Sequence, residues 1–175
     1  MYRFTKKIEN TRQYQRERKT YMEKAHRKIY NYLRMSSRIT TSGMPRENEI
    51  DLIARLGVES VISLVPENVG TDLPGEKERV IARDMTFWRI PVIFKSPEID
   101  DFKLFIKWMA EHSRQKIHVH CEANMRVSVF MALYRIVEEK WSEKDAMTPV
   151  DEIWQPNEIW CAFIENVLNH YGIKR

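Results

Sequence analysis

The segment KIHVHCEANMRVS, residues 116–128, organises the rest of the chain. It begins with a short β-branched run that is typical of a buried strand, and a polar loop follows. From Val127 the pattern becomes that of a helix. The N–H groups of such a loop and of the first helical turn converge, and the helix dipole favours negative charge there. We therefore expect an anion site between this strand and this helix.

Cys121 opens the loop and Arg126 closes it. A positive field of this kind favours the thiolate, which is the form of cysteine that acts as a nucleophile. The planar guanidinium of an arginine can bind two oxygens of one oxyanion. Cys121 and Arg126 are therefore the candidate catalytic pair.

His-Cys, a short loop and then Arg at a helix start resemble the phosphate loop of cysteine-dependent protein tyrosine and dual-specificity phosphatases. The order His-Cys-x-x-Asn-x-Arg-x-Ser is most similar to that of small bacterial tyrosine-phosphatase-like proteins. Three further segments fit that group: 41–45, 61–64 and 154–157. The resemblance begins near Ile29 and runs to the C-terminus. It implies a phosphatase-like fold and hydrolysis of phosphomonoesters, such as phosphotyrosine or a small phosphate, through a cysteinyl-phosphate.

The resemblance also implies roles for the residues around the catalytic pair. The backbone N–H groups that would bind phosphate or sulfate are those of Glu122, Ala123, Asn124, Met125 and Arg126. His120 is expected to orient the loop, with His118 on the same side of the strand. Ser128 would support the thiolate by donating a hydrogen bond. Because Asn tolerates a positive φ, Asn124 can make the turn for which the family usually has Gly.

Four residues separate Cys121 from Arg126, whereas the phosphatases place five there. Rhodanese-like sulfurtransferases also have four, and a shorter loop suits a persulfide on Cys121 better than a bulky phosphate ester. Sulfur transfer is therefore one alternative, and a non-catalytic module that only binds oxyanions is another. The flanking segments resemble phosphatases, so a phosphatase is the preferred prediction.

The general acid of the reaction is a second departure from the family pattern. In the dual-specificity family an Asp follows an Ile-Pro-Val strand, and here the matching position falls near Phe94, which cannot donate a proton. The available carboxylates are Glu98, Asp100 and Asp101, which also suit the first turn of a helix. The identity of the acid therefore stays open.

The composition, with 43% hydrophobic and 31% charged residues in 175, predicts a globular protein. The two cysteines, Cys121 and Cys161, indicate neither a disulfide scaffold nor a zinc site, and Cys161 is expected to be structural. No apolar run is long enough to span a membrane, and no secretory signal is visible. We expect a cytoplasmic enzyme that needs no metal and no cofactor.

Positive charge is concentrated at the N-terminus. Residues 1–35 carry a net charge of +8, so the remaining 140 residues sum to −4 within the chain total of +4. The sequence therefore predicts a basic arm and helix over 1–35 and a phosphatase-like domain over 36–175. Because the body is not basic, specific nucleic-acid binding is not expected. An acidic partner or an anionic membrane surface suits the arm.

Strands that alternate with helices predict an α/β fold with a central, mostly parallel sheet of four to five strands flanked by helices. The predicted strands cover 38–41, 58–65, 86–92 and 116–121. The predicted helices cover 19–34, 47–56, 76–84, 102–109, 127–140, 143–153 and 157–170. Ser142, with Asp145, and Asn157 are the expected N-caps of the last two helices.

Overall fold

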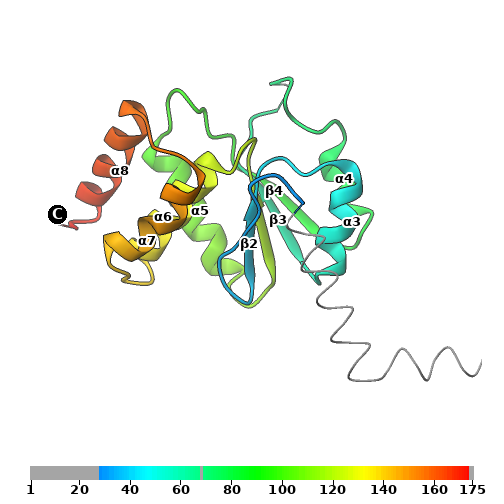
Figure 1. The fold of residues 1–175 in the computed structure, drawn as a ribbon. Coiled ribbons are helices and arrows are strands. Elements are labelled where there is room, and N and C mark those ends of the chain that lie inside the picture. The colour runs from blue at the N-terminus through cyan, green and yellow to red at the C-terminus, as the bar shows by residue number, and fades with distance from the viewer. Residues whose placement is uncertain (1–27, 68, 174–175) are drawn as a thin grey trace, which may run out of the picture.

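The computed structural model describes residues 28–67 and 69–173, and its ribbon is drawn in Figure 1. Its strands form one sheet in the order β1-β2-β5-β3-β4. Their bounds are β1 (Leu33–Arg34), β2 (Ile39–Ser42), β3 (Ser60–Ser63), β4 (Thr86–Arg89) and β5 (Ile117–His120). β1 is antiparallel to β2, and all other neighbours are parallel. The predicted α/β class with a mostly parallel central sheet is confirmed.

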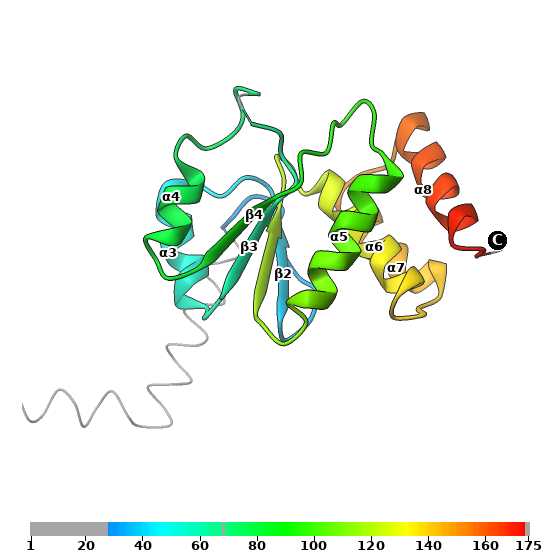
Figure 2. The ribbon, with the colours of Figure 1, turned by 180° about the vertical axis from the view of Figure 1, so that it is seen from behind.

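Helices cover both faces of this sheet, as Figures 1 and 2 show from opposite sides. They are α3 (Glu47–Arg55), α4 (Glu76–Ile81), α5 (Ile99–Glu111), α6 (Met125–Val137), α7 (Glu143–Ile153) and α8 (Glu158–His170). α3 and α4 lie on one face, and α5 to α8 lie on the other. Val61 and Ile62 are adjacent on β3 and enter different hydrophobic clusters, because successive side chains of a strand point to opposite faces. The molecule therefore has three layers.

β5 lies in the middle of the sheet and is buried along its whole length. It pairs with β2 on one side and with β3 on the other, so that His120 lies opposite Ser42 and Ser63. The carboxyl ends of the three strands therefore meet at one edge. In parallel α/β sheets, ligands bind at this edge, and the segment that follows β5 begins there.

The predicted N-caps are confirmed. Asn157 accepts a hydrogen bond from the Trp160 N–H at 3.1 Å, and the Ser142 hydroxyl accepts one from the Asp145 N–H at 3.1 Å. These contacts satisfy N–H groups that a helix start leaves unpaired. Among the described residues, no helix is long and apolar enough to cross a lipid bilayer.

The helix predicted over 19–34 is wrong for residues 28–34, and its first part lies outside the described residues. Residues 28–31 form a turn, and Asn31 has a φ of 50°, which is incompatible with a continuing helix. β1 follows and pairs with β2. Ile29 is buried in the cluster beneath α3. Pairing with the sheet edge and burial of Ile29 therefore outweigh the helical periodicity of this segment. The division of the chain at residue 35 stays a prediction.

Candidate active site

The loop after β5 begins with Cys121, whose side chain is completely buried. Its N–H donates to the Ser42 carbonyl at 3.3 Å, which ties the start of the loop to the end of β2. The loop turns at Asn124, the N-cap of α6, with a φ of 62°. The prediction that Asn124 adopts a positive φ is confirmed. Arg126 then lies in the first turn of α6, so strand, loop and helix start follow one another as predicted.

Backbone donors in this loop are available to a ligand. The N–H groups of Glu122, Ala123, Met125 and Arg126 donate to no acceptor within the described part of the chain. The Glu122 side chain is exposed. A helix start with unpaired N–H groups is an anion-binding element. Binding of phosphate by these groups and by the N–H of Asn124 stays a prediction.

The guanidinium of Arg126 has no hydrogen bond or ion pair with any residue in 28–67 or 69–173. Its side chain is only 7% exposed, and its Nε atom is buried without a partner. The guanidinium lies 5.2 Å from the ring centre of Phe94. A buried charge without a counter-ion is costly, so this geometry is suited to an anion that supplies the missing partner.

Two asparagines, one in the loop and one before β1, connect the loop to the N-terminal part of the described chain. The Asn124 side chain donates to the Asn31 carbonyl at 2.7 Å and to the Thr41 hydroxyl at 3.0 Å. In return, the Asn31 side chain donates to the Ala123 carbonyl at 2.9 Å. No local sequence pattern indicates a role for Asn31, because its contacts join residues more than 90 positions apart.

Gly43 allows the segment after β2 to approach the loop closely. A Cβ atom at this position would lie 2.7 Å from a ring carbon of Tyr30 and 2.8 Å from the Glu122 carbonyl oxygen. The Gly43 N–H donates to the Tyr30 carbonyl at 2.7 Å, and the Met44 N–H donates to the Glu122 carbonyl at 3.0 Å. The requirement for glycine is therefore steric, and it explains part of the resemblance noted for residues 41–45.

The hydroxyl of Ser128 is engaged within α6 and with a neighbouring segment. It donates to the Met125 carbonyl at 2.9 Å and accepts a hydrogen bond from the Trp154 indole N–H at 3.3 Å. In this arrangement the hydroxyl proton is directed at a carbonyl and not at a thiolate. The support that Ser128 would give to Cys121 stays a prediction that requires a rotation of this hydroxyl.

Phe94, at the position where the family has its acid, belongs to an aromatic cluster. Its ring centre lies 5.7 Å from that of Trp154 and 5.5 Å from that of Trp160. The Trp160 indole N–H donates to the Phe94 carbonyl at 3.0 Å. Packing and this hydrogen bond hold the segment between β4 and α5 against the helical layer. Trp154, from the segment 154–157 that resembles the phosphatases, therefore packs against the segment between β4 and α5.

The three candidate carboxylates lie at the start of α5. Glu98 is the N-cap, and the Asp101 carboxylate accepts a hydrogen bond from the Glu98 N–H at 3.4 Å. Burial raises the pKa of Asp101, and this hydrogen bond opposes the shift. Asp100 pairs with Lys103 at 2.9 Å, and the hydrogen bond and charge of Lys103 lower its pKa. Each of these contacts stabilises a helix start, which is the structural role that the sequence allowed.

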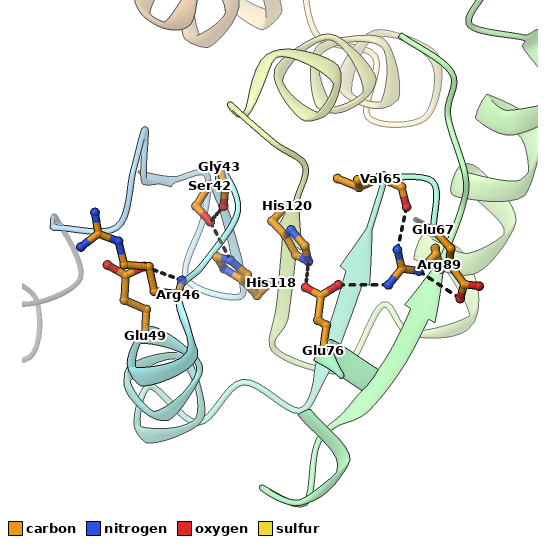
Figure 3. A network of polar contacts seen from close by, with 10 residues as sticks. All are labelled: Ser42, Gly43, Arg46, Glu49, Val65, Glu67, Glu76, Arg89, His118 and His120. Carbon is orange, nitrogen blue, oxygen red and sulfur yellow. Dashed lines mark hydrogen bonds and ion pairs between the residues drawn. The ribbon is translucent and has the colours of Figure 1, made fainter. Parts of the chain in front are cut away.

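His120 and His118 are buried on the same side of β5, as predicted, with ring centres 6.2 Å apart and planes at 20°. The His118 ring contacts the Thr40 hydroxyl at 2.9 Å and the Ser42 hydroxyl at 3.0 Å. His118 therefore packs between β5 and β2. His120 has a different partner, Glu76 (Figure 3).

Glu76, like Asn31, lies at the candidate site without a signal in the sequence. Its carboxylate is 1% exposed, with one oxygen 2.7 Å from His120 Nε2 and the other 3.2 Å from Arg89. The two atoms are in close polar contact, although their geometry does not meet that of an aligned hydrogen bond. Glu76 suited the start of a predicted helix, and no local signal indicated that it faces β5. No group of three His, Cys, Asp or Glu in the described ranges is placed to hold a metal ion.

A search against protein-family models found no match, and neither did a search of curated proteins. The chain is similar to solved structures. A DUF442 protein from Shewanella putrefaciens, named as a candidate phosphatase, is 28% identical, with a TM-score of 0.75 over 83% of this chain and 95% of that one. PTPMT1 in complex with PI(5)P is 15% identical, with a TM-score of 0.68 over 81% of this chain and 96% of that one.

TpbA from P. aeruginosa, solved in complex with pTyr, is 17% identical, with a TM-score of 0.63 over 82% of this chain and 91% of its own. The last two similarities concern the fold alone, whereas the DUF442 protein is similar in sequence as well. The predicted resemblance is therefore confirmed: the chain has the protein tyrosine phosphatase-like fold and resembles the bacterial proteins of that group.

Proposed function

We propose that the protein is a cysteine-dependent phosphatase that hydrolyses phosphomonoesters at Cys121. One observation carries the proposal: a buried cysteine is followed by unpaired backbone N–H groups and by a buried arginine that has no counter-ion among the described residues. Three solved structures with the same fold are named as phosphatases or hold a phosphorylated ligand, which supports this reading.

In the first step the Cys121 thiolate attacks phosphorus. The S–P bond forms as the ester P–O bond breaks, and the leaving oxygen takes a proton from solvent water. The N–H groups of residues 122–126 and the two-pronged guanidinium of Arg126 would hold the three equatorial oxygens and stabilise their charge in the transition state. Arg126 is suited to this role because no protein carboxylate among the described residues occupies it.

In the second step water attacks the phosphorus of the cysteinyl-phosphate. The P–S bond breaks, inorganic phosphate leaves, and Cys121 returns to the thiolate form. The same oxygen ligands serve both steps. The chemistry that the residues supply is therefore nucleophilic and electrostatic, and it is provided by one strand, one loop and one helix start.

The leaving group determines which phosphate esters would react well. Phe94 lies where the family acid is expected, and the nearest carboxylates on its segment cap α5. Without a placed acid, an ester is cleaved fastest when its leaving oxygen needs no proton in the transition state. Aryl esters, including phosphotyrosine, are therefore the preferred class of substrate.

Sulfur transfer through a persulfide of Cys121 remains the second candidate because four residues separate Cys121 from Arg126. The solved structures to which the chain is similar favour the phosphatase. Hydrolysis of an aryl phosphate, lost in Cys121→Ser, supports the phosphatase. Cyanolysis of thiosulfate without any phosphate hydrolysis between about pH 5 and 8, where carboxylates and thiols change charge, supports sulfur transfer instead.

The basic residues of the segment 1–35 are proposed to bind an acidic partner or an anionic membrane surface. Support comes from the point at which this segment joins the fold, because Asn31 contacts the active-site loop directly. Deletion of residues 1–18 should weaken binding to anionic lipid vesicles and leave hydrolysis of a small aryl phosphate unchanged.

A further inference from the structure

Glu76 is a fully buried carboxylate beside the residue that precedes the nucleophile. Its side chain is 1% exposed and that of His120 is completely buried, with 2.7 Å between Oε1 and Nε2. Charged groups are rarely buried unless they are paired, because desolvation is costly. A buried pair of this kind, placed directly behind the loop, therefore needs an explanation beyond packing.

Arg89 holds the same carboxylate from its other side (Figure 3). Its Nη2 lies 3.2 Å from the second oxygen of Glu76, and its Nη1 donates to the Val65 carbonyl at 3.0 Å. Glu76 thereby connects α4, β4 and β5. Burial alone would raise the pKa of Glu76, but the charge of His120, its contact with the carboxylate and the charge of Arg89 together lower it. The carboxylate is thus kept ionised.

Three further titratable groups surround the pair among the described residues. The other titratable groups near it are Asp72, whose charge acts to raise the pKa of Glu76, Glu67, which pairs with Arg89 at 3.7 Å, and His118, whose ring stacks on that of His120. The two carboxylates lie on the Glu76 and Arg89 side. The imidazole is the end of the buried pair that lies next to Cys121 in the chain.

His120 is fixed in place but is not fully satisfied. Its carbonyl accepts the Leu64 N–H at 2.9 Å, and its register opposite Ser42 and Ser63 is set by the sheet. Nε2 faces Glu76, whereas Nδ1 is buried without a hydrogen-bond partner among the described residues. An unpaired buried polar atom costs about 1–3 kcal/mol, and such atoms in native proteins commonly have a functional reason.

We propose that Glu76 is a positioning residue for Cys121: its carboxylate holds the His120 imidazole in place and so sets the electrostatic field in which the Cys121 thiolate forms. The proposal deepens the proposed function and rests on it. Without the Glu76 carboxylate, His120 Nε2 loses the partner that faces it at 2.7 Å, and the imidazole is no longer held in place. The electrostatic field at the start of the loop then changes, and we expect the thiolate to form only at higher pH.

The test compares Glu76→Gln with Glu78→Gln, which removes the same charge from an exposed position on the same helix. Both are made in a Cys161→Ser background, so that Cys121 is the only thiol. The thiolate absorbance and the rate of aryl phosphate hydrolysis are followed against pH. In Glu76→Gln we expect both curves to move up by about one pH unit, with a roughly tenfold loss of kcat/KM on the acidic side. In Glu78→Gln neither curve should move.

Unchanged curves in a folded Glu76→Gln protein would overturn the proposal, since a purely structural carboxylate alters stability alone. If this variant does not fold, Glu76→Asp in the wild type and in a His120→Gln protein gives the same information. Asp should move both curves in the wild type and neither in His120→Gln; equal shifts in both would refute the coupling. The thiolate titration needs no turnover, so it tests Glu76 even if no phosphate ester is hydrolysed.

Discussion

The segments that follow β5 and β4 lie at the same edge of the sheet and are built in opposite ways. After β5, backbone N–H groups and the Arg126 guanidinium have no partner among the described residues, while Asn31 and Gly43 hold the loop in shape. After β4, Phe94 packs between aromatic side chains, and its carbonyl is hydrogen-bonded to Trp160. The first segment offers polar donors to a ligand, and the second is closed by packing.

This difference separates two tasks that a phosphatase must perform. Binding of the phosphoryl group needs fixed donors, which the loop after β5 supplies. Protonation of the leaving group needs a carboxyl group, which the segment after β4 does not place at the expected position. Under the proposed function, the protein is therefore well equipped for the charge on the phosphoryl group and poorly equipped for the charge on the leaving oxygen.

Of the variants considered, Cys121→Ser should have the largest effect on catalysis. We expect kcat for an aryl phosphate to fall on the order of 10⁴-fold or more, because the covalent pathway is lost. Binding of sulfate, measured by calorimetry, should remain, because the N–H groups and Arg126 are unchanged. In the control Cys161→Ser, both properties should be unaffected, since this thiol is exposed and donates to the Pro156 carbonyl, away from the loop after β5. Retained turnover in Cys121→Ser would rule out the cysteinyl-phosphate.

Arg126→Lys tests whether the fork of the guanidinium matters more than its charge. Lysine keeps the charge and loses the two-pronged geometry, so kcat should drop about 10²–10³-fold, as for the loss of one oxyanion ligand. Steady-state kinetics provide the measurement. The matched change Arg135→Lys, on the same helix, should lower thermal stability and spare kcat, because Arg135 binds the Met35 carbonyl and the Trp141 ring. Equal kinetic losses in both would indicate a general effect on α6.

Asn124→Ala tests how the loop is held in shape. Ala must adopt a φ of 62° and cannot reach Asn31 or Thr41, so we expect a loss of about 2–3 kcal/mol in the free energy of unfolding by urea. Asn124→Gly keeps the φ and removes the same hydrogen bonds, and it should cost less. Identical costs would mean that the conformation of the loop stores no strain.

Phe94→Asp should have the smallest effect on the rate of hydrolysis. It tests directly whether the segment after β4 lacks only a proton donor. General acids contribute about 10²–10⁴-fold when well placed, so a partly aligned Asp should raise hydrolysis of an alkyl phosphate about tenfold relative to Phe94→Asn. Both variants lose the same aromatic packing, and their ratio isolates the proton donor. A ratio of one would show that this segment does not approach the leaving oxygen.

The elements that local sequence determines were predicted well. α7 and α8 have the predicted bounds to within one residue because Ser142 and Asn157 cap them from adjacent positions. The buried character of β3 and β5 follows from short β-branched runs. The sequence of strand, loop and Arg126 was also readable, because an anion loop is one continuous segment.

Features that depend on distant partners were not predicted. The side chain of Glu76 faces His120 only because β5 lies between β2 and β3. The hydrophobic periodicity of a strand or helix does not encode the order of strands in the sheet. Similarly, residues 28–34 have helical periodicity, and their actual conformation depends on pairing of β1 with β2. Such contacts depend on the register of the sheet and are therefore invisible to periodicity and capping rules.

The sheet order has a consequence for the way the chain acquires its activity. β5 is the last strand to be synthesised, yet it separates β2 from β3, which do not pair with each other. For example, the contact between Thr40 and His118 joins residues that are 78 positions apart in the sequence. Strand pairing between such distant segments forms slowly during folding. During translation, the sheet stays divided until β5 inserts, and the loop at its end takes shape in the same event. Under the proposed function, the onset of oxyanion binding in a refolding experiment would therefore report when the sheet is complete.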